Sequence, residues 1–345
     1  MPESLRPHAD MSDYEAAAWN QILERVRRQE NRRQLAAVEK VGELAEAAEK
    51  RLQKFFDEHE NVQEIADTLS KPFAGLQGII SRFGASSVSD KRILRRAARR
   101  DSSITSLEDL QHADLEVADR LLSRHNLTYS VVMAAEGAAT SLAVTGFVVS
   151  STVTGGTTLA AAAAAITTDV TANITASSRL VAKIAMSYGY DSRLPDEQLY
   201  ALGVMNYGTT LTAGGKAASL AELSRLVQVM MRHPTHDRLN QFLLIKVTRE
   251  VLKRLGFRIA HQRLAQLVPI AGAFINAGLN ASSISVLGDR AQDAYRLRFL
   301  TEKYDLNPAD WLANVVADDP EEESIDLEAL VREAEAEVDE PGKRP

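Results

Sequence analysis

The sequence contains no cysteine among its 345 residues. This absence excludes disulfide bonds, thiolate metal ligands and cysteine nucleophiles together, and it is typical of proteins from a reducing compartment. The first fifteen residues also lack a short apolar core behind a basic start. We therefore expect no secretory signal and a cytoplasmic location.

Short motifs of several enzyme classes are also missing. The sequence has no G-x-G-x-x-G, H-E-x-x-H or G-x-S-x-G pattern, which are signatures of dinucleotide-binding proteins, zinc peptidases and α/β-hydrolases. Lys216 follows a glycine, but Thr210 and Ala217 break the phosphate-loop pattern. His233 and His236 lie close together without a further cluster of ligands. We therefore predict no metal site and no cofactor.

The net charge of −7 is unevenly distributed. Residues 318–345 hold twelve acidic and three basic residues, a net −9, whereas the remaining chain carries a net +2. A nearly neutral body argues against a nucleic-acid partner, because nucleic-acid-binding proteins usually carry a basic domain. The acidic segment is poor in large apolar side chains, so we predict a disordered C-terminal tail.

The segment from Tyr129 to Arg179 is built mainly from Ala, Gly, Ser, Thr and Val. Between Glu136 and Asp169 it has 32 consecutive uncharged residues, interrupted by two successive glycines. Paired glycines interrupt a helical pattern, and small side chains let helix backbones approach closely. We therefore predict a small-residue helical hairpin at 131–176.

This hairpin is long enough to cross a bilayer, since about 20 mostly apolar residues suffice. Its composition is marginal for insertion, because a carboxylate near the middle of a span, such as Asp169, opposes insertion by about 3 kcal/mol. We favour a hairpin buried within a helical bundle. Insertion of residues 131–176 into a bilayer remains an alternative.

Glu136 and Asp169 need an explanation, because a carboxylate in an apolar helix must be solvated, paired or neutral. In a simple hairpin they lie about 10 Å apart along the axis, at a rise of 1.5 Å per residue. That distance favours separate structural partners over a shared proton or metal. The candidate functional or buried polar residues are Glu136, Asp169, Asn173, Arg179, Tyr188, Tyr190 and Asn280.

Six basic side chains occur within residues 91–100, namely Lys91, Arg92, Arg95, Arg96, Arg99 and Arg100. Ile93, Leu94 and Ala97 supply a narrow apolar stripe for the same predicted helix. The bases form either a solvated charged face or a docking surface for anionic lipid head groups. In the second case each base adds about 1 kcal/mol near the membrane.

Local signals predict several helix ends. Ser106 and Asp109 have the spacing of a capping box, with Asp in place of the usual Glu or Gln. Ser89 is a candidate cap for the basic helix. Gly189 is a candidate left-handed helix stop, and Pro195 a candidate first residue of the next helix.

Helical patterns dominate the body, and no segment sustains the alternation of a half-buried strand. We predict helices within 12–56, 106–122, 196–232, 239–255 and 289–303. The predicted fold class is all-α, a multi-helix bundle organised around the small-residue hairpin, with the acidic tail outside it. We place an N-terminal amphipathic helical region at 1–84, a helical domain at 85–317 and the tail at 318–345.

Several blocks of the sequence, in order, resemble the EcsC family of bacterial proteins. They are SVSDKRILRRA, SLEDL, AAEGAATSLA, the pair Asp169 and Arg179 with SYGYD behind it, LAQLVPIAGAFINAGLN, and GDRAQDAYRLRFLTEKY. The resemblance covers roughly residues 85–304. It implies a helical protein, from a family named after an operon with an ABC exporter, and it implies no established catalytic residues.

Together these observations predict a non-enzymatic EcsC-like protein, cytoplasmic and peripheral at the inner face of the cell membrane. The expected partner is anionic lipid or a membrane transport or envelope protein. One alternative is an enzyme, such as a lipid or envelope hydrolase, that uses Glu136 or Asp169 in a helical cavity. The other is a protein that inserts residues 131–176 into a bilayer.

Overall fold

A computed structural model of the chain describes residues 6–30, 88–122, 174–209, 213–232 and 276–307. Within these ranges the elements are helices joined by turns, and they include no strand. The predicted all-α class is therefore confirmed. Several predicted segments lie outside the described residues, namely 131–173 of the hairpin, 31–56 of the helical region at 12–56, the helix at 239–255 and the acidic tail.

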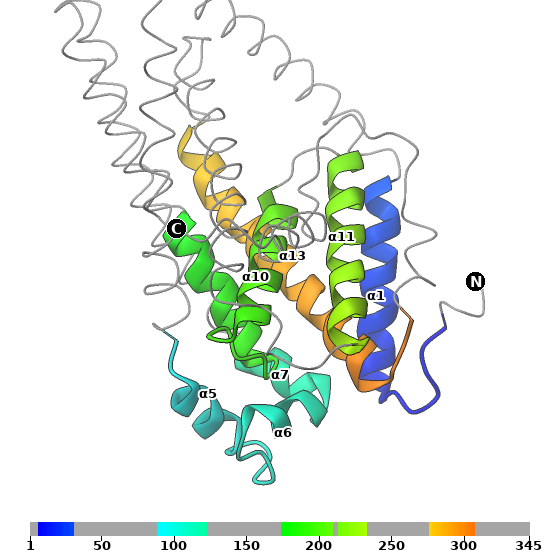
Figure 1. Cartoon of the computed structure of the whole chain (residues 1–345), viewed down its shortest axis with the longest axis vertical. Coiled ribbons are helices and arrows are strands. Elements are labelled where there is room, and N and C mark those ends of the chain that lie inside the picture. Colours follow the sequence, from blue (N-terminus) through cyan, green and yellow to red (C-terminus); the bar gives the residue numbers. More distant parts are fainter. Residues whose placement is uncertain (1–5, 31–87, 123–173, 210–212, 233–275, 308–345) are drawn as a thin grey trace, which may run out of the picture.

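The long helix α13 (Asn276–Lys303) lies at the centre of the described elements. It packs against α10 (Pro195–Thr209), α1 (Asp13–Glu30) and α11 (Ala213–Arg232), and its C-terminal part also meets the shorter helices. Figure 1 shows α13 crossing obliquely between α10 on one side and α1 and α11 on the other. One element thus contacts most of the others.

An aromatic cluster fills the core around α13. Tyr188 and Tyr190 follow a helix that is described from residue 174 to 187, and Tyr200 comes from α10. Their rings surround Tyr295 of α13, with ring centroids 6.4, 5.7 and 5.1 Å away respectively. Trp19 of α1 belongs to the same hydrophobic core. The N-terminal helix and the central helices therefore share one core.

A second, smaller core holds the short helices together. α5 (Asp90–Ala97), α6 (Leu107–His112) and α7 (Leu115–Leu122) lie at one end of the molecule, as Figure 1 shows. Their buried side chains meet around Met186, near the end of the 174–187 helix. The members of this core are Ile93, Ala97, Ile104, Leu110, Leu121 and Met186.

The capping box predicted at the start of α6 is confirmed. The Ser106 hydroxyl accepts from the Asp109 amide at 3.0 Å, and the Asp109 carboxylate accepts from the Ser106 amide at 2.8 Å. The cap predicted for α5 differs, because Ser89 holds the N-cap position but its side chain makes no capping hydrogen bond. The Asp90 carboxylate accepts from the Lys91 amide instead, at 2.7 Å.

Gly189 is the helix stop that the sequence predicts. Its φ of +88° lies in the left-handed region, and an added Cβ would lie 2.5 Å from the Leu107 carbonyl oxygen. Both the backbone conformation and the close approach of α6 therefore require glycine here. The next helix, α10, begins at Pro195 as predicted.

The start of α13 differs from the sequence-based expectation. The helix begins at Asn276, inside the uncharged run, whereas the charge pattern indicated a start near residue 289. Small uncharged residues give no amphipathic signal, so the sequence pattern does not show where the helix begins.

Gly208 lets α10 and α13 approach each other closely. A Cβ added to Gly208 of α10 would lie 2.1 Å from Leu287 Cδ1 on α13.

Candidate functional site

The basic side chains of α5 and the turn after it form one exposed surface. We call Lys91, Arg92, Arg95, Arg96, Arg99 and Arg100 the basic face. Five of them are exposed and Arg96 is half-buried, whereas Ile93 and Ala97 are buried in the small core. The apolar stripe of α5 is therefore used for packing, and the helix presents mainly charge to solvent.

Ionic contacts fix α5 in addition to its buried stripe. Arg193, in the turn before α10, donates to the Asp90 carboxylate at 3.0 Å and to Asp191 at 2.7 Å. The carboxylate at the N-terminus of α5 is thereby bound to a base outside the basic face. The six bases of the face are thus held on a fixed scaffold.

Lys183 adds a seventh base beside this surface. It lies on the 174–187 helix, three residues before Met186, and its side chain is half-buried. Burial, followed by the positive charges of Arg96 and Arg92, lowers the pKa of Lys183 to about 8. Three cations from two helices are therefore close enough to influence each other's charge.

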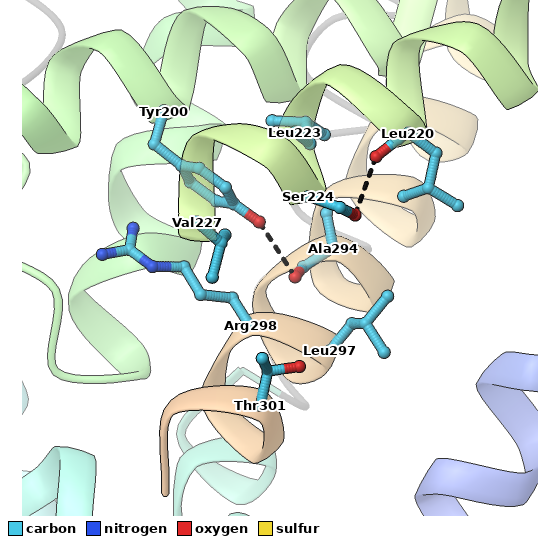
Figure 2. Close-up of a pocket in the computed structure, with 9 residues that line it drawn as sticks. All are labelled: Tyr200, Leu220, Leu223, Ser224, Val227, Ala294, Leu297, Arg298 and Thr301. Carbon is cyan, nitrogen blue, oxygen red and sulfur yellow. Dashed lines mark hydrogen bonds between the residues drawn. The ribbon is translucent and has the colours of Figure 1, made fainter. Parts of the chain in front are cut away.

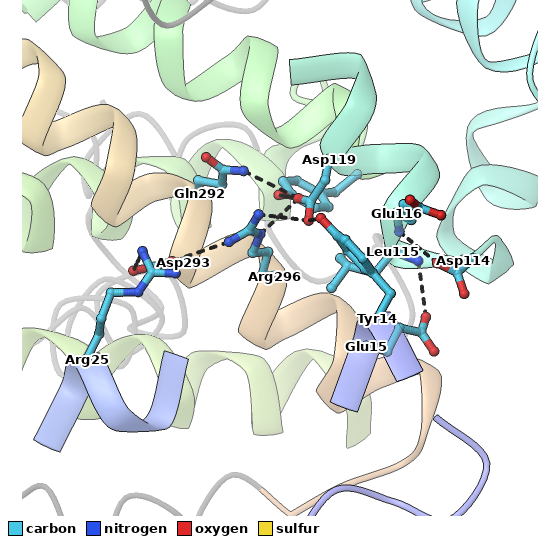
Figure 3. A network of polar contacts seen from close by, with 11 residues as sticks. Tyr14, Glu15, Arg25, Asp114, Leu115, Glu116, Asp119, Gln292, Asp293 and Arg296 are labelled. Carbon is cyan, nitrogen blue, oxygen red and sulfur yellow. Dashed lines mark hydrogen bonds and ion pairs between the residues drawn. The ribbon is translucent and has the colours of Figure 1, made fainter. Parts of the chain in front are cut away.

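A second candidate region is a polar network centred on Asp119 of α7. Its carboxylate accepts from the Tyr14 hydroxyl at 2.7 Å, the Tyr188 hydroxyl at 2.5 Å and Gln292 at 3.3 Å. Arg296 donates to both carboxylate oxygens, through Nε and Nη2, at 2.8 Å each. Figure 3 shows Tyr14, Gln292 and Arg296 converging on Asp119 from α1 and α13.

Burial, and then the neighbouring Asp119 charge, raise the pKa of Tyr188 well above its usual value. The phenol is therefore protonated at neutral pH and serves as a hydrogen-bond donor.

Asp293 lies one turn before Arg296 in α13. Burial raises the pKa of the Asp293 carboxyl to about 6, although Arg25 of α1 pairs with it at 3.1 Å. The pKa of Asp293 is thus closer to neutral pH than the ordinary value of 3.8.

A third network surrounds Arg298, which is buried. Its guanidinium donates to both oxygens of Glu197, at 2.7 and 2.6 Å, and to Glu302 at 2.7 Å. It also lies over the rings of Tyr190 and Tyr200, 4.0 and 4.5 Å from their centroids. Burial opposes the charge, but the two carboxylates outweigh it and raise the pKa of Arg298 well above its usual value.

Glu15 of α1 is bound in the same manner at the end of α13. Lys303 donates to Glu15 at 2.7 Å and to the Ala113 carbonyl at 2.8 Å, and the Leu115 amide donates to Glu15 at 3.1 Å. The Tyr304 hydroxyl donates to the other oxygen of Glu15. Burial opposes ionisation, yet the hydrogen bonds from Lys303, Tyr304 and Leu115 outweigh it and lower the pKa of Glu15.

These networks explain the polar side chains of α13. Its bases bind the carboxylates of α1, α7 and α10, so the helix joins all three through charge-assisted hydrogen bonds. Glu15, Asp119 and Glu197 are each held by a base and are buried. Each of these carboxylates therefore connects α13 to another helix.

A small cavity lies between α10, α11 and α13, shown in Figure 2. The Tyr200 hydroxyl donates to the Ala294 carbonyl at 3.1 Å, and the Ser224 hydroxyl donates to Leu220 at 2.9 Å. Thr301 Oγ1 is buried there with no hydrogen-bond partner. The cavity measures about 10 Å³, which is room for a single water molecule. A substrate would not fit.

The structure places the predicted polar candidates in different settings. Tyr188 and Tyr190 are buried, and they donate to Asp119 and Glu302 respectively. Arg179 is half-buried on the 174–187 helix, and Asn280 lies in the first turns of α13. The remaining three candidates, Glu136, Asp169 and Asn173, lie outside the described residues.

Within the described ranges, no group of three or more His, Asp or Glu side chains is arranged to hold a metal ion. In the same part of the chain, no helix is both long enough and apolar enough to cross a membrane.

Sequence reasoning missed Asp119, Glu197, Arg298 and Lys183. A signal for Arg298 exists, because its neighbours Leu297, Phe299 and Leu300 are apolar. A charge among side chains that are buried needs a partner. For Lys183 the signal is a single base in the apolar stretch LVAKIAM.

Comparisons with known proteins match part of the chain. The model of the EcsC protein family matches residues 147–300. A protein of Bacillus subtilis (strain 168), described as uncharacterized protein YdbA, is 26% identical over 221 residues, which cover 62% of this chain and 71% of YdbA. No solved structure matches the chain. The family match confirms the resemblance over residues 147–300, which include α10, α11 and most of α13.

Proposed function

We propose that the chain, whose residues 147–300 match the model of the EcsC protein family, is a non-enzymatic helical protein that docks on anionic membranes. The docking surface is the basic face of α5, and the site of action is the cytoplasmic side of the cell membrane. The observation that carries this proposal is the exposure of five bases on α5 and the turn after it, while Ile93 and Ala97 of the apolar stripe of α5 are already buried.

The chemistry of the basic face supports electrostatic docking. Each base near an anionic surface contributes about 1 kcal/mol, so six bases together suffice for reversible binding. Within the described residues, the exposed large apolar side chains are Tyr14 and Val286, and neither lies on α5. Apolar insertion by this face is therefore not expected, and salt should weaken binding, because exposed charges are screened within about 8 Å at physiological ionic strength.

The non-enzymatic part of the proposal rests on the buried networks. Glu15, Asp119 and Glu197 are bound to Lys303, Arg296 and Arg298 respectively. The cavity beside Arg298 has room for one water molecule. In the part of the chain that the structure describes, these polar groups pair with one another across helices.

Vesicle co-sedimentation tests the proposal. The protein is incubated with phosphatidylcholine vesicles, with or without phosphatidylserine, at low and high salt. We expect binding that requires phosphatidylserine and is lost at high salt. A triple variant, Lys91→Glu, Arg95→Glu and Arg99→Glu, should abolish it, because these side chains are exposed on α5 and in the turn after it.

A matched control separates the basic face from net charge. The variant Arg6→Glu, Arg120→Glu, Arg225→Glu makes the same charge change at exposed positions outside the basic face and should retain binding. Equal loss in both triple variants would contradict a localised docking surface. Binding that survives high salt would point instead to insertion of the 131–176 segment, because apolar burial is not screened. Absence of binding at low salt would refute membrane docking.

A further inference from the structure

We propose that residues 318–323, which we call the acidic run, bind the basic face of the same chain and compete there with an anionic membrane. This inference rests on the proposed function for its consequence, because the bases that the acidic run covers are the ones that dock on the membrane. The contact itself does not depend on docking, so it can be tested without lipid.

The basic face offers a dense group of exposed positive charges. The Asp90 carboxylate at the start of α5 is bound to Arg193, so it does not neutralise the face. The exposed bases on α5 and in the turn after it are Lys91, Arg92, Arg95, Arg99 and Arg100. Several charges that act together gain more from an acidic partner than isolated exposed pairs do.

Exposed arginines on other helices are less attractive for an acidic partner. Arg120 of α7 pairs with Glu116, and Arg225 of α11 pairs with Glu222 at 3.2 Å. Each of these arginines already has a carboxylate of its own helix beside it. An additional acidic partner therefore gains less there than at the basic face.

The acidic run matches the basic face in charge. Residues 318–323 read DDPEEE, so they carry five carboxylates in six positions. The rest of the tail, 324–345, holds the other seven of its twelve acidic residues together with its three bases. The negative charge of the tail is thus most concentrated in the run, and its five carboxylates equal the exposed bases of the face in number.

The acidic run is also within reach of the face. The described chain ends at Asn307, and Lys303 donates to the carbonyl of Ala113, which packs against the smaller core that includes Ile93 of α5. Helix α13 contacts α6 and α7, and both contact α5 (Figure 1). Two steps between contacting helices amount to about 20 Å, whereas residues 308–317 can span about 33 Å.

The tether makes even a weak contact effective. A ligand joined to its site by a short linker reaches an effective concentration of about 1 mM. A contact with a dissociation constant of about 0.25 mM then leaves the face open in about one fifth of the molecules. Because only these molecules bind vesicles, the apparent affinity for an anionic membrane falls about fivefold.

Cross-linking of the full chain without lipid tests the contact. A carbodiimide joins a carboxylate to a lysine amine only where the two touch, and mass spectrometry locates the bond. The variant Arg95→Lys, Arg99→Lys adds two amines to the face at constant charge. The control variant Arg6→Lys, Arg225→Lys adds two amines at exposed positions outside it.

At low salt we expect the lysines of the face, including Lys91, to join the acidic run several-fold more often than the control lysines do. High salt should remove this difference, because exposed charges are screened within about 8 Å at physiological ionic strength. Equal yields at face and control positions would overturn the contact. Bonds between heavy and light copies in an isotopically mixed sample would assign it to a second chain and overturn the intramolecular form.

Vesicle binding tests the competition. In the full chain, five substitutions remove the charge of the acidic run, namely Asp318→Asn, Asp319→Asn, Glu321→Gln, Glu322→Gln and Glu323→Gln. This variant should bind phosphatidylcholine vesicles with phosphatidylserine about fivefold more tightly than the unmodified chain. The matched control makes the same charge change later in the tail and should gain less, with Glu328→Gln, Glu333→Gln, Glu335→Gln, Glu337→Gln and Glu340→Gln.

The two measurements separate this inference from the proposal on which it rests. An equal gain in both tail variants would show an effect of net charge alone and overturn competition by the acidic run. Cross-links to the face without vesicle binding by any variant would support the contact and refute membrane docking. Vesicle binding that is unchanged in the variant of the acidic run, without cross-links to the face, would overturn the contact and leave docking intact.

Discussion

Replacing Asp119 by Asn should destabilise the protein more than any comparable change on the surface of α7. The substitution keeps the shape of the side chain but removes the charge that faces Arg296, whose side chain is 14% exposed. It also replaces one acceptor oxygen by a donor, although Asp119 accepts from three further side chains. Removing one partner of a buried ion pair typically costs 3–5 kcal/mol.

The structure favours the lower end of that range. Asp293 lies 3.9 Å from Arg296 and would partly compensate the orphaned guanidinium. We therefore expect Asp119→Asn to lower the free energy of unfolding by about 3 kcal/mol. The matched control is Glu116→Gln on the same helix, which breaks an exposed pair with Arg120. It should cost no more than about 0.5 kcal/mol.

Urea unfolding followed by tryptophan fluorescence measures both variants. Trp19 of α1 is buried in the core that the network borders, so its emission reports loss of this packing. With a slope of about 2 kcal/mol per molar urea, the midpoint should fall by about 1.5 M. The double variant Asp119→Leu, Arg296→Met should lose less stability than the two single variants together, because no charge is left buried. Equal midpoints for Asp119→Asn and Glu116→Gln would refute a stabilising network.

Three further changes test other parts of the structure. Asp293→Asn should alter the pH dependence of stability. The pKa of Asp293 is about 6 in the folded state and 3.8 in the unfolded chain. Between pH 3.8 and pH 6 the folded protein therefore holds a proton on Asp293 that the unfolded chain has released. As pH rises from 4 to 7, the free energy of unfolding of the unmodified chain should thus fall by up to about 3 kcal/mol relative to that of this variant. A difference in unfolding free energy that stays constant with pH in urea titrations would contradict the pKa shift. Gly208→Ala should lower the free energy of unfolding by about 1–2 kcal/mol, although alanine has the better helix propensity, because the added Cβ would meet Leu287. An unchanged melting temperature would show that the Leu287 side chain moves aside without strain. A chain ending at Ala317 should keep a cooperative thermal transition, since the segment beyond it is net −9 and poor in large apolar groups, and loss of cooperativity would show that the tail takes part in folding.

Much of the local structure could be predicted from short stretches of sequence. The capping box at Ser106, the stop at Gly189 and the start at Pro195 each depend on chemistry within a few residues, and each is found. The basic face could be predicted as well, because six bases within ten residues cannot all be buried. The all-α class follows from the same kind of local periodicity.

The sequence alone could not show what its bases and acids bind. Tyr188 lies 69 residues from Asp119, and Arg296 lies 177 residues from it, yet all three meet in one network. Arg298 reaches Glu197 across 101 residues. A helical pattern identifies a charged side chain but not the partner that another helix brings to it.

The sequence by itself determined the helical class, several helix ends and the presence of a basic helix, because these depend on neighbouring residues. Only the tertiary structure decided that α13 is the element to which the others are bound, and that Lys183 lies beside Arg92 and Arg96. The physical reason is that burial and long-range pairing depend on how helices pack, and this packing sets both the desolvation of a charge and the groups that compensate it.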